Sequence, residues 1–331
     1  MKRTATLAHL AAAAAAAAGQ TPWTQAPPNV LWLQVDSLDG RLLDPTSPYF
    51  DKLLVHGFKD FMAKGVVWTR HYTNSPQCVP SRTGMLTGRY VHELGTTNNG
   101  QGLARSTKTG ALDSSCVSLW GKAQCIAFAA RQNVSETFLD LAARSGYDVH
   151  VVGRVDAGAG ILDDYAGATG GTGFHSGPAL NSLARGADIA GTTDVEPWSS
   201  TDRNDPNPYA PDEREDGVLE AWFRQHTPIA GQPWLAMLGL LDPHPPYACN
   251  ATWRAKVNES SVDAPFLPAL ADMHPFDARQ SLLKHVTLNY TDAQLREMRT
   301  CYWAAAAQAL SGLVDVLKTA ESTGHLNNTG A

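Results

Sequence analysis

A cysteine with unusual neighbours is the strongest candidate for chemistry in this sequence. Cys78 stands two residues before Pro80 and four before Arg82. Proline suits the first turn of a helix, so this spacing predicts Cys78 at a helix N-terminus, where free N–H groups and the helix dipole favour anions. Arg82 then projects from the same face and can hold an oxyanion. The alternative is a buried structural cysteine that simply precedes a helix.

Three further polar residues lie at the ends of apolar runs of strand length. They are Asp36, Arg154 and His244. Such runs are typical of strands buried on both faces of a parallel sheet, and ligands bind at the carboxyl ends of these strands. We therefore expect the three residues to share one site. For Arg154 the alternative is an ion pair with Asp156 on a solvated loop.

The elements that must position these residues alternate between strands and helices. Apolar runs predict strands at residues 29–35, 66–72, 147–155 and 234–241. Helical spacing covers 50–64, 137–144 and 218–223, and a capping box from Thr291 to Gln294 begins a long last helix. Residues 245–288 are Pro-rich and irregular. The alternation favours an α/β fold with a mostly parallel sheet sandwiched by helices.

The segment around Cys78 resembles the signature of type I sulfatases. The stretch Cys78-Val-Pro-Ser-Arg-Thr-Gly-Met-Leu-Thr-Gly-Arg89 matches eight fixed positions among twelve residues. Other stretches resemble the arylsulfatase K subgroup, namely Val35-Asp-Ser-Leu-Asp-Gly-Arg41, Tyr72-Thr-Asn-Ser-Pro-Gln-Cys78, Asn98-Asn99, Met273-His-Pro275 and Tyr302. The resemblance runs from about residue 28 to 321 and implies the alkaline-phosphatase-like fold.

The resemblance also implies a modified residue and a reaction. In this family the cysteine that corresponds to Cys78 becomes formylglycine (3-oxoalanine), through a formylglycine-generating enzyme in the endoplasmic reticulum. One hydroxyl of the hydrated aldehyde attacks sulfur and the alcohol leaves. The second hydroxyl then loses its proton and sulfate is expelled. A divalent cation polarises the sulfate oxygens, and the resemblance implies Ca²⁺, which takes oxygen ligands.

The metal-binding part of the site is carried over from the family by position. Asp36 corresponds to a metal-binding aspartate, and the modified Cys78 is the second metal contact in this part of the chain. Ser37 stands where most sulfatases have an adjacent second aspartate, which puts a paired carboxylate in doubt. Asp39 is interpreted as a residue that caps the turn.

The substrate-binding part is carried over in the same way. The resemblance implies that Arg82 steadies the nucleophile and that Arg154 replaces a sulfate-binding lysine. Arginine is a charged planar fork that can bind sulfate but cannot donate a proton. His244 corresponds to a histidine that contacts sulfate and protonates the leaving oxygen. His274 and the pair Asn98–Asn99 are weaker candidates for substrate contacts, and Asn pairs more often form turns.

Composition and the N-terminus suggest the compartment. The chain has 331 residues, 43% hydrophobic, and a net charge of −6, without the basic character of a nucleic-acid binder. Lys2, Arg3 and the apolar run to Ala18 predict a signal peptide at 1–19, with residues 20–331 as the catalytic domain. We expect a secreted or endolysosomal protein with no membrane span after cleavage. Candidate glycosylation sites are Asn133, Asn250, Asn258, Asn289 and Asn327.

The odd number of cysteines leaves one thiol over in an oxidising compartment. We expect Cys116 and Cys125 to close a small surface loop. Cys249 and Cys301 are candidates for a second bridge, although the sequence does not fix the connectivity. This pairing leaves Cys78 over. Residues 103–132 and 156–212 are interpreted as loop insertions.

These observations predict a sulfatase that cleaves sulfate monoesters, with sulfated sugars as one substrate class. We also expect the catalytic domain to be incomplete at its C-terminus, because two further metal ligands of the family follow the next strand. Two alternatives stay open. One is a formylglycine-dependent phosphodiesterase or phosphonate hydrolase, and the other is an inactive secreted glycoprotein that binds sulfated glycans.

Overall fold

The fold is taken from a computed structural model of the whole chain. It describes residues 27–52, 56–158, 168–169, 211–229, 231–244, 249, 251–266, 268–283 and 291–330. The expected signal peptide and most of the expected insertion 156–212 lie outside these ranges, as do Asn250 and Asn289. Within the described ranges, no helix combines the length and apolar character that crossing a bilayer requires.

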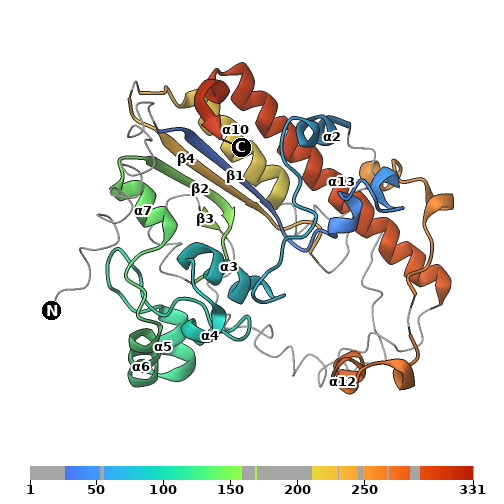
Figure 1. Ribbon diagram of the computed structural model, residues 1–331, viewed down its shortest axis with the longest axis horizontal. Helices are drawn as coiled ribbons and strands as arrows, with labels where there is room; N and C mark the ends of the chain where they lie inside the picture. Colours follow the sequence, from blue (N-terminus) through green and yellow to red (C-terminus); the bar gives the residue numbers. More distant parts are fainter. Residues whose placement is uncertain are drawn as a thin grey trace, which may run out of the picture.

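A parallel sheet forms the centre of the molecule (Figure 1). Its order is β3-β2-β4-β1-β5, with bounds β1 Asn29–Val35, β2 Asp148–Arg154, β3 Ala168–Thr169, β4 Trp234–Leu240 and β5 Thr329–Gly330. Each strand pairs with its neighbours in parallel. The carboxyl ends of β1, β2 and β4 therefore meet at one edge of the sheet, as the sequence predicts.

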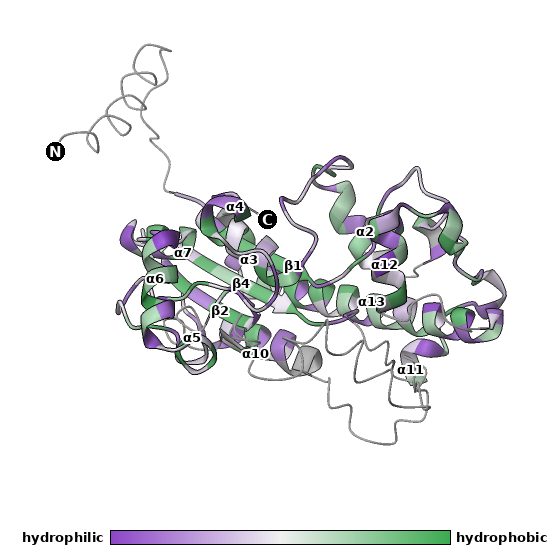
Figure 2. Ribbon diagram, turned by 90° about the horizontal axis from the view of Figure 1, so that it is seen from below, coloured by the Kyte–Doolittle hydropathy of each residue, from purple (hydrophilic) through white to green (hydrophobic). Residues whose placement is uncertain are grey.

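Alternation along the central strand β4 divides the core into two layers. Trp234 and Leu238 pack with the helices α10 (Pro211–Gln225) and α13 (Asp292–Ser322). Leu235 and Met237, one residue out of phase, pack on the other face with α3 (Cys78–Thr87) and α7 (Phe138–Arg144). Successive strand side chains point to opposite faces, so a fully buried strand needs apolar residues at every position. Figure 2 shows this apolar centre between the more polar helices.

The remaining elements are short. They are η1 Gly40–Leu42, η2 Phe50–Lys52, α2 His56–Ala63, α4 Val91–Leu94, α5 Ser114–Trp120, α6 Lys122–Gln132, α11 Ala251–Arg254, η3 Glu259–Ser261, η4 Leu270–Asp272, α12 Pro275–Leu283 and η5 His325–Asn328. The capping box predicted before the last helix is present at Thr291, and Thr137 forms a second capping box before α7.

Two predictions of local structure are wrong and one is incomplete. Residues 66–72 form no strand. Trp68 and Tyr72 are about four-fifths exposed, and this segment pairs with no strand of the described sheet. The segment 103–132 is helical rather than an irregular loop over much of its length, because it contains α5 and α6. The segment 245–288 is irregular over much of its described part but also contains α11 and α12.

Candidate active site

The strand ends bring the predicted residues together. Asp36 directly follows β1, Arg154 is the last residue of β2, and His244 lies in the turn after β4. Cys78 is the first residue of α3, which packs over the same edge (Figure 1). One ligand atom each from Asp36, Cys78 and His244 lies within 4.8 Å of the other two. These three side chains therefore lie close together in the structure, and their predicted roles stay predictions.

The turn after β1 holds the Asp36 carboxylate in place. The Asp36 N–H donates to the Leu240 carbonyl at 3.1 Å, which extends the pairing of β1 with β4 by one residue. Ser37 then adopts a left-handed φ of 55°, which is uncommon for a residue other than glycine. The Tyr302 hydroxyl, from α13, donates to the Ser37 carbonyl at 2.9 Å and accepts from the Asp39 N–H at 2.6 Å. A helix distant in sequence thus fixes this turn.

Cys78 is a free thiol in the first turn of α3, and a residue outside the helix bonds that turn. The Val79 N–H donates to Asn99 Oδ1 at 3.2 Å, and Val79 and Pro80 are buried. The Cys78 Sγ lies 3.7 Å from Asp36 Oδ1 as a weak donor. Burial, and then the Asp36 carboxylate, raise the pKa of the Cys78 thiol to about 11. The unmodified side chain is therefore a protonated thiol at neutral pH, which makes it a poor nucleophile.

Arg82 is a buried link between α3, β1 and β2. Its guanidinium is 3% exposed and donates to Asp36 Oδ2 at 3.2 Å, to the Arg154 carbonyl at 2.7 Å and to Gln34 Oε1 at 3.3 Å. Hydrogen bonds from a charged guanidinium are stronger than those between neutral groups. Arg82 therefore orients the Asp36 carboxylate and the end of β2.

Arg154 carries the more accessible of the two positive charges. Its Nε bonds the fully buried Asp156 carboxylate and lies 3.5 Å from Asp36 Oδ2, while 17% of the side chain stays exposed. Burial would lower the pKa of Arg154, but Asp156 and Asp36 together raise that pKa above its ordinary value. The alternative pairing with Asp156 is therefore present, but it is buried beside Asp36 rather than placed on a solvated loop.

Glycines allow β2 to place Arg154. Gly153 has φ +79°, and a Cβ there would lie 2.3 Å from the Gly239 carbonyl oxygen. A Cβ at Gly239 would lie 2.1 Å from the Arg154 carbonyl oxygen. The two strands therefore approach at their carboxyl ends more closely than side chains permit.

The other candidates have structural roles or lie elsewhere. Asp39 caps η1 and pairs with Arg41 at 2.6 Å, as the capping interpretation predicts. Burial alone would raise the pKa of Asp39, but bonds from Arg41 lower it. Asn98 Oδ1 accepts from the Gly100 N–H in a turn. His274 is exposed, and its Nδ1 accepts from the Phe276 N–H at the start of α12.

Sequence reasoning missed one residue that supports the site and did not foresee the contacts of two others. Gln34 is a polar residue inside an otherwise apolar strand, a signal that could have marked it as a partner of Arg82. Asp156 was considered only as a solvated partner, although it is fully buried. Asn99 Oδ1 accepts from the Val79 N–H and so holds the start of α3, a role that the Asn98–Asn99 pair did not signal.

The fold and the site together define an α/β protein with a buried cysteine, one carboxylate, two guanidinium groups and an imidazole at the carboxyl edge of a parallel sheet. The sulfatase family model matches residues 28–330. The chain belongs to the sulfatase family.

Individual relatives agree with this assignment. Arylsulfatase K from Danio rerio is 26% identical over 322 residues, which cover 91% of this chain and 53% of that protein. Arylsulfatase K from Gallus gallus is 27% identical over 338 residues, which cover 97% of this chain and 55% of that protein. The chain thus spans about half the length of the curated relatives it matches.

Solved structures show the same fold. A phosphonate monoester hydrolase from Silicibacter pomeroyi superposes with a TM-score of 0.57 and 20% identity, over 91% of this chain and 61% of that chain. The corresponding enzyme from Agrobacterium radiobacter gives a TM-score of 0.56 and 18% identity over the same shares. The predicted α/β architecture is confirmed.

Proposed function

We propose that this chain forms a catalytic part of a sulfatase that hydrolyses sulfate monoesters through a formylglycine made from Cys78. The observation that carries the proposal is the free Cys78 beside Asp36 and His244, in a chain whose four other cysteines form disulfides. The Cys78 Sγ stands in the structure for an oxygen of the modified residue, whose aldehyde carbon is the present Cβ. Its match to the family motif supports conversion during biosynthesis by a formylglycine-generating enzyme.

The residues of the site suit a two-step transfer. In the first step, one hydroxyl of the hydrated aldehyde, having lost its proton to solvent, attacks sulfur, and the bond from sulfur to the ester oxygen breaks. His244, when protonated, donates its proton to the departing oxygen. In the second step, neutral His244 accepts the proton of the remaining hydroxyl, the aldehyde carbonyl re-forms and sulfate leaves. Arg154 binds the sulfate oxygens, and Arg82 keeps the Asp36 carboxylate oriented.

A divalent cation fits part of this donor set. Asp36 offers a carboxylate, residue 78 offers an oxygen once it is converted, and His244 lies within reach of both. When bound, the cation polarises sulfate oxygens and favours the ionised nucleophile. Ca²⁺ takes six to eight oxygen ligands, so water or residues outside the described ranges have to complete the site.

Sequence and structure also support a secretory setting. The two disulfides are typical of an oxidising compartment. Among the expected glycosylation sites, Asn133 and Asn258 are exposed on the described surface. The signal sequence, a secreted or endolysosomal location and a sulfated sugar as substrate remain parts of the proposal.

The test combines peptide mass spectrometry with turnover. The complete protein is produced through a eukaryotic secretory pathway, and the peptide that contains residue 78 is analysed for the aldehyde. We expect conversion and hydrolysis of 4-nitrophenyl sulfate, and Cys78→Ala should lower kcat at least about a thousandfold because the covalent step is lost. Cys116→Ala/Cys125→Ala serves as a cysteine control that leaves the modified residue in place.

Each opposing outcome has a meaning. An unconverted Cys78 in folded protein from its native source would overturn the proposal. Faster hydrolysis of a phosphodiester or a phosphonate monoester than of the sulfate would favour the phosphoryl-transfer alternative. Full conversion with no turnover, but with binding of sulfated glycans, would favour the inactive glycoprotein.

A further inference from the structure

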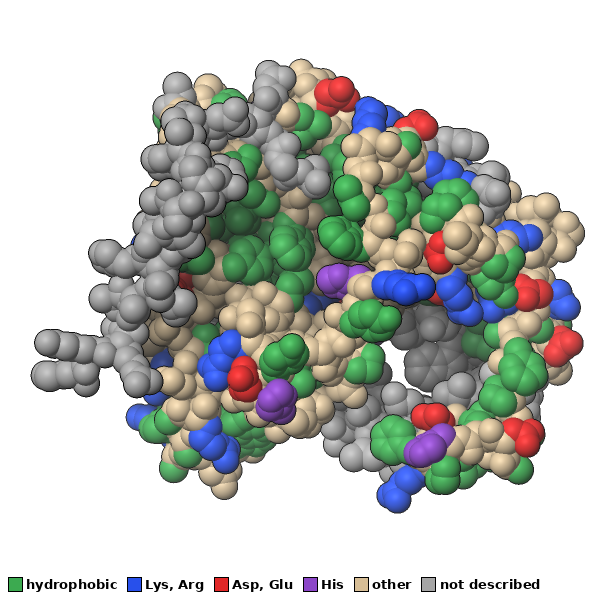
Figure 3. Space-filling view, in the orientation of Figure 1, with side chains coloured by type: hydrophobic (Ala, Val, Ile, Leu, Met, Phe, Trp, Pro, Cys, Tyr) green, Lys and Arg blue, Asp and Glu red, His purple; other side chains and the backbone are tan. Residues whose placement is uncertain are grey.

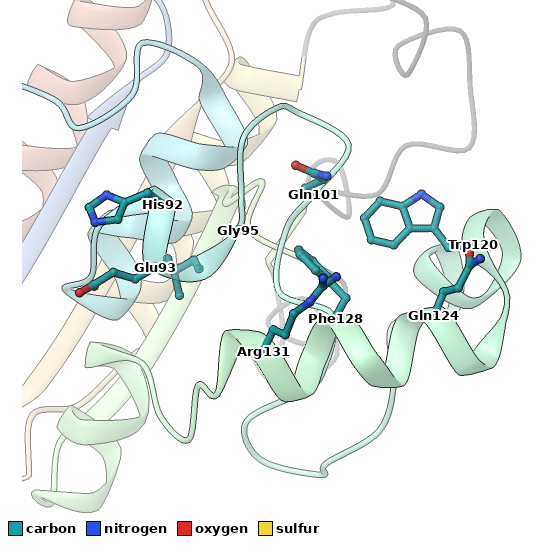
Figure 4. Close-up of a pocket in the computed structure, with 9 residues that line it drawn as sticks. His92, Glu93, Gly95, Gln101, Trp120, Gln124, Phe128 and Arg131 are labelled. Atoms are coloured by element: carbon teal, nitrogen blue, oxygen red, sulfur yellow. The ribbon is translucent and has the colours of Figure 1, made fainter.

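A pocket lies between α4 and the helix pair α5–α6 (Figure 4). Its volume is about 580 Å³, within the range of small-molecule sites. Trp120, Gln124, Phe128 and Arg131 line one wall, and Gln101 lines the other. Figure 4 shows Gln101, Trp120 and Phe128 around the same opening. The catalytic scheme above uses none of these side chains.

The walls of this pocket are held rigidly. The disulfide Cys116–Cys125 joins α5 to α6, and both cysteines are fully buried. At the end of α6 the buried Gln132 amide donates to the Gly102 carbonyl at 2.8 Å and accepts from the Ala104 N–H at 2.9 Å. The Arg89 guanidinium donates to the Gln132 carbonyl at 2.6 Å. A pocket with fixed walls loses little entropy when a ligand binds.

An aromatic surface lies beside amide and guanidinium groups in this pocket. The Trp120 indole is partly exposed and packs edge-on against Phe128, with ring centroids 5.2 Å apart. The Arg131 guanidinium lies 5.8 Å from the centroid of the Phe128 ring. An indole face accepts the C–H face of a pyranose, while amides and guanidinium groups bond its oxygens. This combination is suited to a saccharide.

The charge in the pocket favours an anionic ligand. Arg131 is exposed, and within the described ranges it has no carboxylate partner. The acidic residue of the lining, Glu93, already lies 3.7 Å from Arg89 and accepts from the Tyr90 N–H. Gln101 Oε1 accepts from the Thr97 N–H and hydroxyl, so its amide N–H groups are the ones left for a ligand oxygen. Donors and positive charge therefore dominate.

One loop connects this pocket with the catalytic cysteine. Gln101 lies on the pocket, and Asn99, two residues earlier, bonds the first turn of α3 that begins at Cys78. We propose that this pocket binds an anionic saccharide unit, a pyranose that carries a sulfate or a carboxylate group. The choice of sulfated probes rests on the proposed function, whereas the pocket itself does not depend on turnover.

Binding is measured in the complete protein with the background variant Cys78→Ala, so that chemistry does not contribute. The probe is a sulfated heparin-derived tetrasaccharide. Its binding is measured by calorimetry and by ¹⁹F NMR of 5-fluorotryptophan-labelled protein. We expect the Trp120 resonance, assigned with Trp120→Phe, to shift on titration. Trp120→Ala and Arg131→Gln should each weaken binding about tenfold or more, which corresponds to about 1.4 kcal/mol. Trp120→Phe keeps an aromatic face and should restore much of the affinity lost in Trp120→Ala.

Controls separate this pocket from the catalytic site. Lys122→Gln, on the exposed surface of α6 outside the lining, should leave affinity within about twofold of the background protein. The desulfated tetrasaccharide, which keeps its carboxylates, distinguishes the two sources of charge. If Trp120→Ala and Arg131→Gln left the affinity for the tetrasaccharide unchanged while Arg154→Gln abolished binding, the pocket proposal would be overturned. Binding that depends on Trp120 in a protein without sulfatase turnover would support the pocket and overturn only the proposed function.

Discussion

At the scale of single residues, the site is a balanced cluster of buried charges. Arg82 and Arg154 face Asp36 and Asp156, and the most exposed of these side chains, Arg154, is only 17% exposed. An unpaired charge at such depth is costly, so each residue needs its partners. The guanidinium of Arg82 donates its hydrogen bonds to protein atoms. Arg154 is the member with surface left for a substrate.

Arg154 provides the test at this scale. Arg154→Lys keeps the charge but loses the planar fork, so one ammonium group has to serve Asp36, Asp156 and sulfate together. We expect kcat/KM for a sulfate ester to fall about 10- to 100-fold, from the loss of one or two charge-assisted hydrogen bonds. Steady-state kinetics of the converted enzyme measure this change.

The control for this substitution is Arg144→Lys. Arg144 is largely exposed and pairs with Glu136 at 3.0 Å, so the same replacement there should leave kcat/KM unchanged. If Arg154→Lys had wild-type kcat/KM, Arg154 would not be a sulfate ligand.

The main site residues were predictable because their signal is local. Cys78 and Arg82 belong to one contiguous motif, and Asp36 and His244 follow strongly apolar strands. The residues that stabilise these buried charges and fix the turn after β1 are distant from them in the sequence. Gln34 meets Arg82 across 48 residues, and Tyr302 reaches Ser37 across 265 residues. Such pairs depend on the packing of α3 and α13 against the sheet, which spacing along the chain does not encode.

At the scale of elements, burial decided which apolar runs became strands. The run 234–240 is apolar throughout, is buried on both faces and forms β4. The run 66–72 includes Thr69, Arg70 and His71 and has no neighbouring strand among the described residues. The segment 103–132 was interpreted as a loop because it differs from the subgroup. Its residues 122–132 are rich in Ala, Gln, Lys and Arg, which favour a helix, and they form α6.

A cluster of histidines at the opposite edge of the sheet predicts a dependence of stability on pH. His150 on β2 stacks on Trp222, with centroids 4.9 Å apart, and His226 bonds His325 at 3.1 Å. The pKa of His150 is lowered by burial, against a smaller raising effect of Asp148, and burial also lowers the pKa of His325. Protonation of either ring therefore favours the unfolded chain.

The lowered pKa values of the two histidines determine how stability changes with pH. Both histidines have an ordinary pKa of 6.5, and the unfolded chain binds protons first as the pH falls below that value. Their contribution to stability is complete above pH 6.5 and decreases as the pH falls through the lowered pKa values. Denaturant unfolding at pH 5.0 and 7.5 measures the difference, and stability should be lower at pH 5.0.

His150→Phe isolates one member of the cluster. Among the described residues its Nε2 is buried without a hydrogen-bond partner, so a phenyl ring keeps the stacking on Trp222 and removes the titration. The loss of stability between the two pH values should become smaller. His274→Phe, at an exposed position, should leave it as it is. An unchanged pH dependence in His150→Phe would show that His150 does not contribute.

At the scale of the whole molecule, α13 ties distant parts of the described fold together. It contacts α2, α10, α11 and β1, and its Cys301 forms a disulfide with Cys249, which follows the active-site turn after β4. The second disulfide closes only the local pair α5–α6. On the face shown in Figure 3, acidic and basic side chains lie side by side.

The two disulfides should therefore differ in their effect on stability. Cys249 and Cys301 are 52 residues apart, and Cys116 and Cys125 are 9 apart. A bridge that closes a longer loop removes more entropy from the unfolded chain, about 4 kcal/mol for the long loop and about 3 kcal/mol for the short one. Cys249→Ala/Cys301→Ala should thus lower the free energy of unfolding more than Cys116→Ala/Cys125→Ala, in guanidinium unfolding followed by circular dichroism.

Function separates the two bridges further. The long bridge ties Cys249, which follows the turn of His244 in the chain, to Cys301 of α13, so its loss should lower turnover as well as stability. The short bridge supports the pocket between α4 and α6, so its loss should weaken saccharide binding while Cys78 is still converted. Equal losses of turnover in both double variants would mean that the bridges act only through overall stability. A larger loss of stability from the short bridge would show that the folded state, rather than loop length, sets the contribution of each.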